Sequence, residues 1–564
     1  MKFKILLKKV CGVLGALCLM NFPGPVGAQR YISSAWCPDK GDGTYVNPVL
    51  HADYSDPDVC AVGGDYYLTA SSFGCAPGLP VLHSRDLVNW RIIGYALKEL
   101  VPTDFYARAC HGKGVWAPAI RYHNGEFYIY WGDPDFGIYM VKSTDPAGEW
   151  SRPVLVKAGK GLIDPCPLWE GDNCYLVFAW AASRAHINSV LCVEPMNAEG
   201  TRTLGHPRLV FDGNADDNFT AEGPKFYKRN GYYYILCPAG GVEMGWQLAL
   251  RSKNVYGPYE ARRVMEQGKT LVNGPHQGGW IHTECGEDWF LHFQDKGCYG
   301  RVVHLQPMHW KEDWPVIGED RDGDGCGNPV VRHAKPRTKQ PVPMENPVES
   351  DEFDTPEIGM QWEWHSNYHD LYGFPTPYGY MRLYTHKLSP EYVNLWEAPN
   401  LFLQKFPAEE FTAETKLKMV SKEDRQQGGL IVMGWDYCML TVQREGDTFV
   451  LKQTVCQDAE QGGEERIDTL AVWAPTERQR IRYSPTVSLE LFMRLNVRKG
   501  GECTFAYSRD GRTYTSCGRP FRARQGKWIG AKMGFVSVEP HTEPALNRGW
   551  LDIDWFRVGP LKRD

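Results

Sequence analysis

Three acidic residues in the first half of this chain stand in short motifs that hold the backbone in a fixed, non-helical shape. Asp56 and Asp164 each precede a proline, and Glu222 precedes a Gly-Pro pair. The residue before a proline is restricted to extended or turn conformations, so the backbone beside each carboxylate is held in one shape. A single such residue is most often part of a turn. Three together can perform acid–base chemistry. One carboxyl group protonates a leaving oxygen and another activates water, which is what hydrolysis of a glycosidic bond requires.

An internal repeat indicates which elements position these carboxylates. Five segments each begin with a polar turn and continue as a strand rich in aromatic and β-branched residues, with almost no helical periodicity between them. At intervals of 47 to 61 residues, the equivalent aromatic positions are Tyr67, Tyr128, Tyr175, Tyr234 and Phe290. Five units of about four strands each predict a five-bladed β-propeller. The innermost strands of a propeller converge on its axis, so we expect the three carboxylates to meet there.

A proline-rich stretch at 335–347 separates the repeat from a region of different texture. From about residue 350, segments such as 492–498 alternate apolar and polar residues, and tight turns join them. This pattern predicts an antiparallel β-sandwich. The expected fold is all-β, a five-bladed β-propeller followed by a concanavalin-like β-sandwich. The expected boundaries are 1–28 for a signal peptide, 29–338 for the catalytic propeller and 339–564 for the C-terminal sandwich.

The first 28 residues have the parts of a secretory signal peptide. Four lysines precede or begin an apolar stretch at 10–20, and Val26-Gly27-Ala28 offers a cleavage site of small residues. The apolar stretch is too short to span a bilayer, and no later stretch is long enough. We therefore expect export to the periplasm, the cell surface or the extracellular space. The chain has 17 cysteines without C-x-x-C or zinc spacing, so most are expected to be buried apolar residues, and their pairing stays open.

Composition limits the class of partner. The formal net charge is −6 and charged residues make up 23% of the chain, without a long basic run. Nucleic-acid binding depends on clustered positive charge, so nucleic acid is excluded as a partner. The chain also contains 20 Trp and 29 Tyr. Aromatic rings pack protein cores and also stack on sugar rings, and composition alone does not separate these two uses.

The motifs around the three carboxylates resemble those of glycoside hydrolase family 43. Val115-Trp116-Ala117-Pro118 adds to this resemblance, and His276-Gln-Gly-Gly with the segment from 292 to 307 is similar to its exo-acting β-xylosidase and α-L-arabinofuranosidase branch. The resemblance is strong over about residues 44–334 and looser beyond. It implies an inverting enzyme on a five-bladed propeller, with a C-terminal β-sandwich.

The resemblance assigns a role to each carboxylate. Asp56 would be the general base that activates water, and Glu222 the general acid. Asp164 would hold Glu222 in position and raise its pKa through the proximity of like charge. Inversion leaves room for a water molecule, so the carboxyl groups of base and acid should lie about 6.5–9.5 Å apart.

The resemblance also implies residues that bind the sugar. Arg301 would donate to a sugar hydroxyl and pair with Asp164, while Trp116 and Phe73 would wall the sugar site. His276 corresponds to an axial histidine near a metal or water site. No organic cofactor is implied, but a structural calcium in the propeller channel is, with His276 beside it. A second candidate calcium loop, 320–325, lacks the glutamate that should occupy its twelfth position, which favours a simple acidic turn.

The expected activity is the release of terminal non-reducing α-L-arabinofuranosyl or β-D-xylosyl residues from hemicellulose or pectin oligosaccharides of the plant cell wall. The sequence does not settle arabinose against xylose, so β-xylosidase as the main activity stays open. Two other classes of protein share parts of this pattern. A retaining five-bladed glycosidase needs a nucleophile in a different early motif, which is absent. A non-catalytic carbohydrate-binding propeller is disfavoured because all three carboxylates are present. Oligomeric state cannot be read from the sequence.

Overall fold

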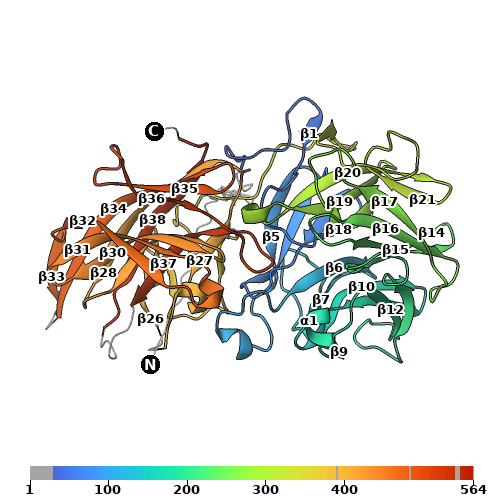
Figure 1. Cartoon of the computed structure of the whole chain (residues 1–564), viewed down its shortest axis with the longest axis horizontal. Coiled ribbons are helices and arrows are strands. Elements are labelled where there is room, and N and C mark those ends of the chain that lie inside the picture. Colours follow the sequence, from blue (N-terminus) through green and yellow to red (C-terminus); the bar gives the residue numbers. More distant parts are fainter. Residues whose placement is uncertain (1–29, 389–390, 482–483, 540–546, 563–564) are drawn as a thin grey trace, which may run out of the picture.

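The computed structural model describes residues 30–388, 391–481, 484–539 and 547–562, and shows two β domains side by side (Figure 1). The predicted signal peptide, residues 1–28, lies outside the described residues. The first domain runs from blue to yellow-green in Figure 1 and the second from orange to red. Within the described residues, one short α-helix occurs, α1 (Ala182–Ala185), and no helix is long and apolar enough to cross a membrane.

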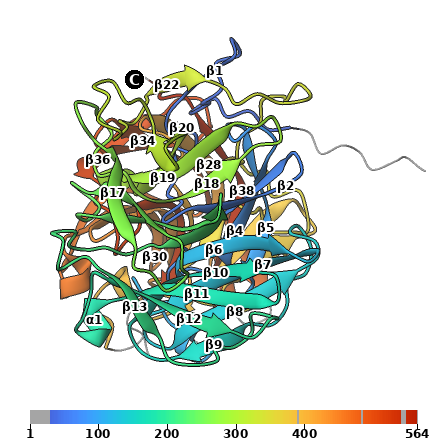
Figure 2. The same cartoon turned by 90° about the vertical axis from the view of Figure 1, so that its right-hand side faces the viewer.

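The first domain contains five four-stranded antiparallel sheets, which confirms the predicted five-bladed propeller (Figure 2). In each sheet the strands follow chain order from the innermost outward. Blades 1 and 2 consist of β2 (Asp58–Val62), β3 (Asp65–Thr69), β4 (Gly78–Ser84) and β5 (Trp90–Leu97), then β6 (Trp116–His123), β7 (Glu126–Asp133), β8 (Gly137–Ser143) and β9 (Val154–Ala158). Blade 3 consists of β10 (Leu162–Glu170), β11 (Asn173–Trp180), β12 (Val190–Met196) and β13 (Arg208–Asp212). Blades 4 and 5 consist of β14 (Lys225–Arg229), β15 (Tyr232–Ala239), β16 (Trp246–Ser252) and β17 (Glu260–Glu266), then β18 (His276–His282), β19 (Asp288–Asp295), β20 (Arg301–Lys311) and β21 (Trp314–Ile317).

The five repeated aromatic positions all fall on the second strand of their blade, namely β3, β7, β11, β15 and β19. The turns that lead into these strands follow from the sequence. Asn124-Gly125 and Asn230-Gly231 each have two residues at positive φ and join strands through a two-residue loop. Asn-Gly is the pair that such tight hairpins favour. Before the first blade, β1 (Thr44–Val46) pairs antiparallel with β22 (Arg332–Ala334), which follows the last blade, and the two form a separate two-stranded sheet.

The second domain is a sandwich of two eight-stranded sheets, as predicted. The first sheet contains β23 (Glu363–Trp364), β27 (Phe402–Lys405), β37 (Lys532–Glu539), β29 (Gln427–Met433), β30 (Tyr437–Glu445), β31 (Thr448–Cys456) and β32 (Glu465–Trp473), with β26 (His386–Lys387) beside β37. The second contains β24 (Gly373–Thr376), β25 (Tyr380–Tyr384), β38 (Trp550–Gly559), β28 (Phe411–Ser421), β34 (Ser484–Arg498), β35 (Glu502–Ser508) and β36 (Thr515–Arg522), with β33 (Glu477–Ile481) beside β34. Buried aromatic rings fill the space between the sheets, as where Trp362 stacks on Phe402 with centroids 4.5 Å apart.

Buried polar contacts lock the two domains together. Ala76 of the propeller forms a β-bridge with Trp364 of the sandwich. The amide of Gly530, in the loop before β37, donates a 3.0 Å hydrogen bond to Asp53, just before the first blade. Asn367 bonds both backbone groups of Leu100. Backbone contacts of this kind fix orientation, so the loop at 523–531 has a defined place against the propeller.

Candidate active site

Each of the five blades has a residue at positive φ within two positions of the start of its innermost strand. In blade order these residues are Asp56, Ala117, Asp164, Gly223 and Gln277, with φ values of 52°, 34°, 57°, 56° and 33°. Four of them are not glycine, and left-handed backbone is strained for such residues. Three of the five lie at register shifts of their strands, in blades 2, 3 and 5. This left-handed residue recurs in every blade at the same end of the propeller. It directs the side chains that could act in catalysis toward the axis.

Asp56 is buried and held by two donors. The Ser71 hydroxyl donates a 2.6 Å hydrogen bond to Oδ2, and Nη1 of Arg301 lies 2.9 Å from Oδ1. Ser71 in turn accepts a 2.7 Å bond from the amide of Ala117, which fixes its orientation. Hydrogen bonds from a charged donor are short and strong. Both oxygens of Asp56 are therefore held in a fixed orientation at the wall of the site.

The predicted pairing of Arg301 with Asp164 is wrong, because Arg301 pairs with Asp56 instead. The reason lies in the backbone. Arg301 begins β20 after Gly300, and its amide donates a 2.8 Å bond to Asp53, three residues before Asp56. This contact directs the guanidinium to the carboxylate of the first blade.

Asp164 fixes the chain beside Glu222. Its Oδ2 accepts a 2.7 Å hydrogen bond from the amide of Gly223 and a longer one, 3.4 Å, from Gln277. The Asp164 carboxyl group is almost fully buried. Burial first, and then the nearby charge of Glu222, raises its pKa well above the ordinary value. Asp164 therefore positions Glu222 through the backbone amide of Gly223, which follows it, and not through the Glu222 side chain.

Glu222 carries the properties expected of an acid. Its Oε1 lies 3.1 Å from Nε2 of His276, and its side chain keeps 30% exposure, which leaves it accessible from the cavity. Burial first, and then the negative charge of Asp56, raises the pKa of Glu222 to about 7, although Arg301 opposes the shift. Burial and the charge of Arg301 lower the pKa of His276 to about 3. A neutral imidazole can donate to the carboxylate or accept from the carboxylic acid, so this contact tolerates both protonation states.

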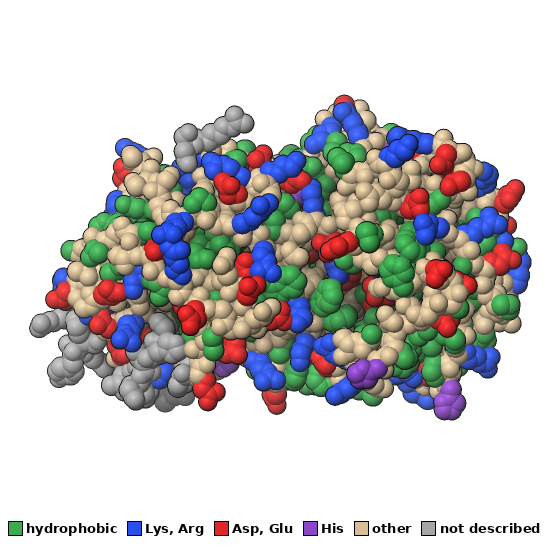
Figure 3. Space-filling view, in the orientation of Figure 1, with side chains coloured by type: hydrophobic (Ala, Val, Ile, Leu, Met, Phe, Trp, Pro, Cys, Tyr) green, Lys and Arg blue, Asp and Glu red, His purple; other side chains and the backbone are tan. Residues whose placement is uncertain are grey.

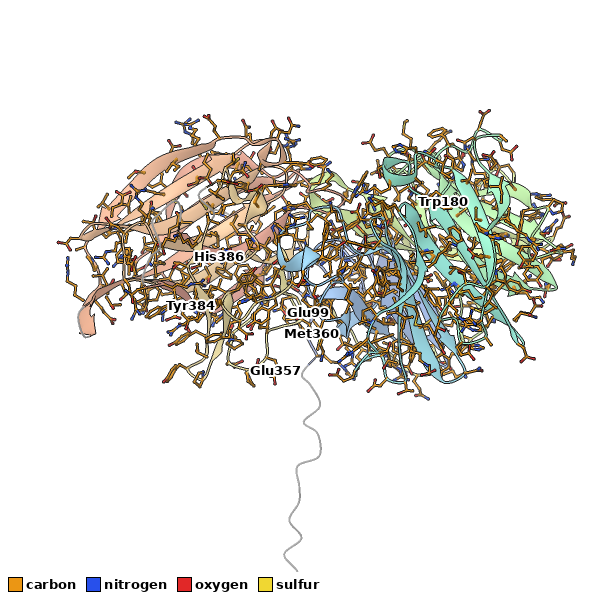
Figure 4. The ribbon with its side chains drawn as sticks, turned by 90° about the horizontal axis from the view of Figure 1, so that it is seen from below. Glu99, Trp180, Glu357, Met360, Tyr384 and His386 are labelled. Carbon is orange, nitrogen blue, oxygen red and sulfur yellow. The ribbon has the colours of Figure 1, made fainter. Side chains whose placement is uncertain are left out.

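The three carboxylates open onto one cavity of about 180 Å3. Phe73 and Trp116 meet edge to face at 6.2 Å on one wall, and Trp180, at the end of β11, contributes another (Figure 4). Trp528, from the sandwich, closes the cavity, with its ring 6.3 Å from that of Trp116. Its backbone carbonyl accepts a bond from Ser55, next to the base. A pocket with aromatic walls and carboxylates at one end suits a single sugar ring.

Similarity to known proteins identifies the family. The profile of Glycosyl hydrolases family 43 matches residues 45–315, and that of the β-xylosidase C-terminal concanavalin A-like domain matches 350–559. A putative β-xylosidase of Xylanibacter ruminicola is 36% identical over 506 residues, covering 89% of this chain and 87% of its own. The chain belongs to glycoside hydrolase family 43. A non-reducing end α-L-arabinofuranosidase of Bacteroides ovatus, BoGH43B, is 30% identical over 445 residues, 74% of this chain and 79% of its own.

A solved relative shares both domains of this family 43 hydrolase. The BlXynB protein of Bacillus licheniformis, a family 43 protein, superimposes with a TM-score of 0.74 at 25% identity, covering 92% of this chain and 100% of its own. The fold and the glycosidase class predicted from the sequence are thus confirmed. The individual residue roles remain predictions.

The cavity brings together nearly all the sequence-predicted site residues of the family 43 hydrolase. Asp56, Asp164, Glu222, Arg301, Trp116 and Phe73 line it, and His276 touches it through Glu222. Trp528 and Gln277 were missed, and so was Ser71. A loop tryptophan of a separate domain has no local signal for a propeller site. The glutamine stands beside His276 in a recognised motif, which could have drawn attention to it.

The expected channel calcium does not fit His276 as the residues stand. Calcium prefers six to eight oxygen ligands. Nδ1 of His276 has no hydrogen-bond partner, but in the described chain no group of three side-chain ligands includes this residue. One imidazole nitrogen is a poor calcium ligand, and no step of catalysis is assigned to a metal. The carboxylates of Asp320, Asp322 and Asp324 do cluster, and two of them already accept bonds from amides of their own turn.

Proposed function

We propose that this enzyme is an exo-acting, inverting glycosidase that releases single α-L-arabinofuranosyl or β-D-xylosyl residues from the non-reducing ends of plant hemicellulose or pectin chains. One observation carries the proposal. Asp56 and Glu222 face the same cavity but have different surroundings, since Asp56 pairs with Arg301 while Glu222 lies against a neutral imidazole. Two carboxyl groups in such different environments can take separate roles, one as the base and the other as the acid.

The mechanism follows from this asymmetry. Asp56 accepts a proton from a water molecule that attacks the anomeric carbon, while Glu222 gives its proton to the leaving oxygen. The anomeric carbon to leaving-oxygen bond breaks as the new bond to water forms, so the released sugar is inverted. Arg301 holds the Asp56 carboxyl group in place, with Nη1 2.9 Å from Oδ1. Asp164 holds the backbone next to Glu222, which keeps the acid aimed at the leaving oxygen.

The size of the cavity supports removal of one sugar at a time. A volume of about 180 Å3 is small compared with the roughly 300–1,000 Å3 of pockets that hold drug-sized ligands, and suits one pentose ring. The names of the relatives include both β-xylosidase and α-L-arabinofuranosidase. Either pentose therefore remains part of the proposal.

Parallel initial rates on 4-nitrophenyl α-L-arabinofuranoside and 4-nitrophenyl β-D-xylopyranoside test the activity and name the sugar. Asp56→Asn serves as the control, because loss of the base stops hydrolysis whatever the leaving group. Turnover of either substrate that is lost in Asp56→Asn supports the proposal. Wild-type protein that hydrolyses neither these nor fragments of arabinoxylan, arabinan and xyloglucan would contradict it.

We also propose that the enzyme acts outside the cytoplasm, in the periplasm, on the cell surface or in the medium. The lysine-rich start, the short apolar stretch and the small residues before Gln29 support export. Polymeric plant substrates do not enter cells freely, so location and substrate agree. Fractionation of the native host with an antibody against the sandwich domain tests the location. Recovery in the cytoplasm with an intact N-terminus would overturn it.

A further inference from the structure

The cavity holds one sugar, so the remainder of a polymeric substrate lies against its rim. The leaving oxygen must lie next to Glu222, because that residue supplies its proton. Glu222 ends the connection between blades 3 and 4, and the next sugar unit therefore leaves the cavity on the side of blade 4. The surface on that side decides how the rest of the chain is bound.

Three exposed apolar side chains lie at this end of the propeller. Phe219, three residues before Glu222, is 54% exposed, while Met244 is 77% and Leu271 88% exposed. Strand direction puts them at the catalytic end. β14 runs away from Glu222 and β15 returns, so the β15–β16 loop opens beside the site, as does the connection from β17 to β18. We call Phe219, Met244 and Leu271 the blade-4 rim.

Phe219 is held rigidly despite its exposure. Its ring meets that of Trp246 edge to face, with centroids 5.9 Å apart. Trp246 donates a 3.1 Å hydrogen bond to Asn218, and the guanidinium of Arg263 covers its ring at 3.9 Å. An aromatic ring that is already fixed loses little conformational entropy when a ligand covers it.

The loops that carry Met244 and Leu271 are tied together and to the site. Asn273 donates a 3.1 Å hydrogen bond to the carbonyl of Glu243, and Gln294 donates to both Asn273 and the carbonyl of Leu271. A Cβ at Gly245 would lie 3.2 Å from Nδ1 of His276, so the Met244 loop reaches the neighbour of the acid. The loop that carries Met244 thus packs against a residue that contacts the acid.

The opposite side of the cavity differs in chemistry. There Lys527 pairs with Glu460, and Arg184 pairs with Asp135. Figure 3 shows charged side chains of both signs intermixed over one face of the molecule. Charged groups that are already paired offer little to a neutral sugar chain, whereas apolar side chains pack against the C–H faces of its rings.

We propose that the blade-4 rim binds the sugar units next to the cleaved pentose, in the backbone of a neutral polysaccharide of linked pyranose rings. This inference rests on the proposed function and deepens it, because the rim would set the preference for a polymer over a small glycoside. Burial of two or three apolar side chains against a sugar chain is sufficient for a selective effect on binding.

Paired substrates test the rim. The double variant Met244→Ser/Leu271→Ser and the single variant Phe219→Ala are compared with wild type on xylotetraose, on soluble arabinoxylan and on the two 4-nitrophenyl glycosides. The ratio of kcat/KM for the better natural chain to that for the nitrophenyl glycoside should fall about 5- to 20-fold, mostly through KM. Leu371→Ser, 53% exposed on the sandwich, is the matched control and should leave the ratio unchanged.

A separate binding measurement keeps the outcome unambiguous. Calorimetric titration of xylotetraose and an arabinoxylan oligosaccharide into Glu222→Gln protein, with and without Phe219→Ala, measures binding apart from turnover. Weaker binding in the Phe219→Ala background supports the rim. An unchanged ratio and unchanged binding would overturn the rim while wild-type activity keeps the proposed function. A wild type inactive on every glycoside would instead contradict the proposed function.

Discussion

The backbone amide of Gly223 donates a 2.7 Å hydrogen bond to Asp164, so a carboxyl group of blade 3 fixes the chain directly after the acid of blade 4. The contact spans two blades and passes through backbone rather than through the reacting side chain. Asp164 thereby acts on Glu222 by position. The predicted rise of the Glu222 pKa through the charge of Asp164 is not seen, because burial and then the charge of Asp56 raise that pKa. Replacing Asp164 by Asn keeps an acceptor for this amide and so tests the contact itself.

Glu222→Gln should lower kcat by about 100- to 10,000-fold on oligosaccharides, because the leaving oxygen is no longer protonated. The loss should be much smaller on a 4-nitrophenyl glycoside, whose leaving group departs without a proton. Rates on both substrates, with circular dichroism to check the fold, measure this. Equal losses on the two would argue against the role of acid.

Activity should fall as the pH rises through about 7. Glu222 works in its protonated form, and its pKa is raised to about 7 by burial and by Asp56. Above that pH the protonated fraction, and with it kcat/KM, drops about tenfold per unit. A pH profile of kcat/KM on an oligosaccharide measures this alkaline limb, the fall in kcat/KM above about pH 7. A constant rate up to pH 9 would place the acid elsewhere.

Arg301→Met should cost both activity and stability. It leaves the buried Asp56 carboxylate without its ion partner, and breaking a buried pair costs about 3–5 kcal/mol. Arg301 also opposes the rise of the Glu222 pKa, so the alkaline limb should move to higher pH. Thermal unfolding and the pH profile report the two effects. Arg301→Lys keeps the charge and should show a smaller loss of each.

Trp528→Gly should weaken catalysis yet not the fold. The residue lines the cavity and has a φ of 65°, a conformation that glycine adopts without strain. We expect kcat/KM to fall about 10-fold or more on every substrate, because an aromatic wall is lost, while Tm stays level or rises. Tyr378→Gly, at an exposed sandwich turn, is the control for loss of a surface aromatic. A lowered Tm without loss of activity would contradict this assignment.

The released sugar should be the inverted anomer. In the proposed mechanism Asp56, held by Ser71 and Arg301, takes a proton from the water that attacks the anomeric carbon. Early-time proton NMR of the reaction distinguishes the anomers before they equilibrate. First appearance of the retained anomer would replace the single displacement with a covalent route.

The blades and the three carboxylates could be predicted from the sequence because both depend on short local motifs. Tyr128 and Tyr234 mark second strands through their Asn-Gly turns, and Asp56, Asp164 and Glu222 stand in motifs that fix their own backbone. The features that could not be predicted depend on contacts between residues far apart in the sequence. The partner of Arg301 was misassigned because the contact with Asp53 that aims it cannot be read locally. The left-handed backbone at Ala117 and Gln277 has no signal either, since neither residue type favours it.

Because Trp528 reaches the cavity from the sandwich, the boundary drawn by the two sequence profiles is not a boundary of the catalytic unit. An engineer who trims the chain to its propeller, or exchanges sandwiches between relatives, changes one wall of the sugar pocket as well as the attached module. Shuffled libraries of this enzyme should keep the two halves together.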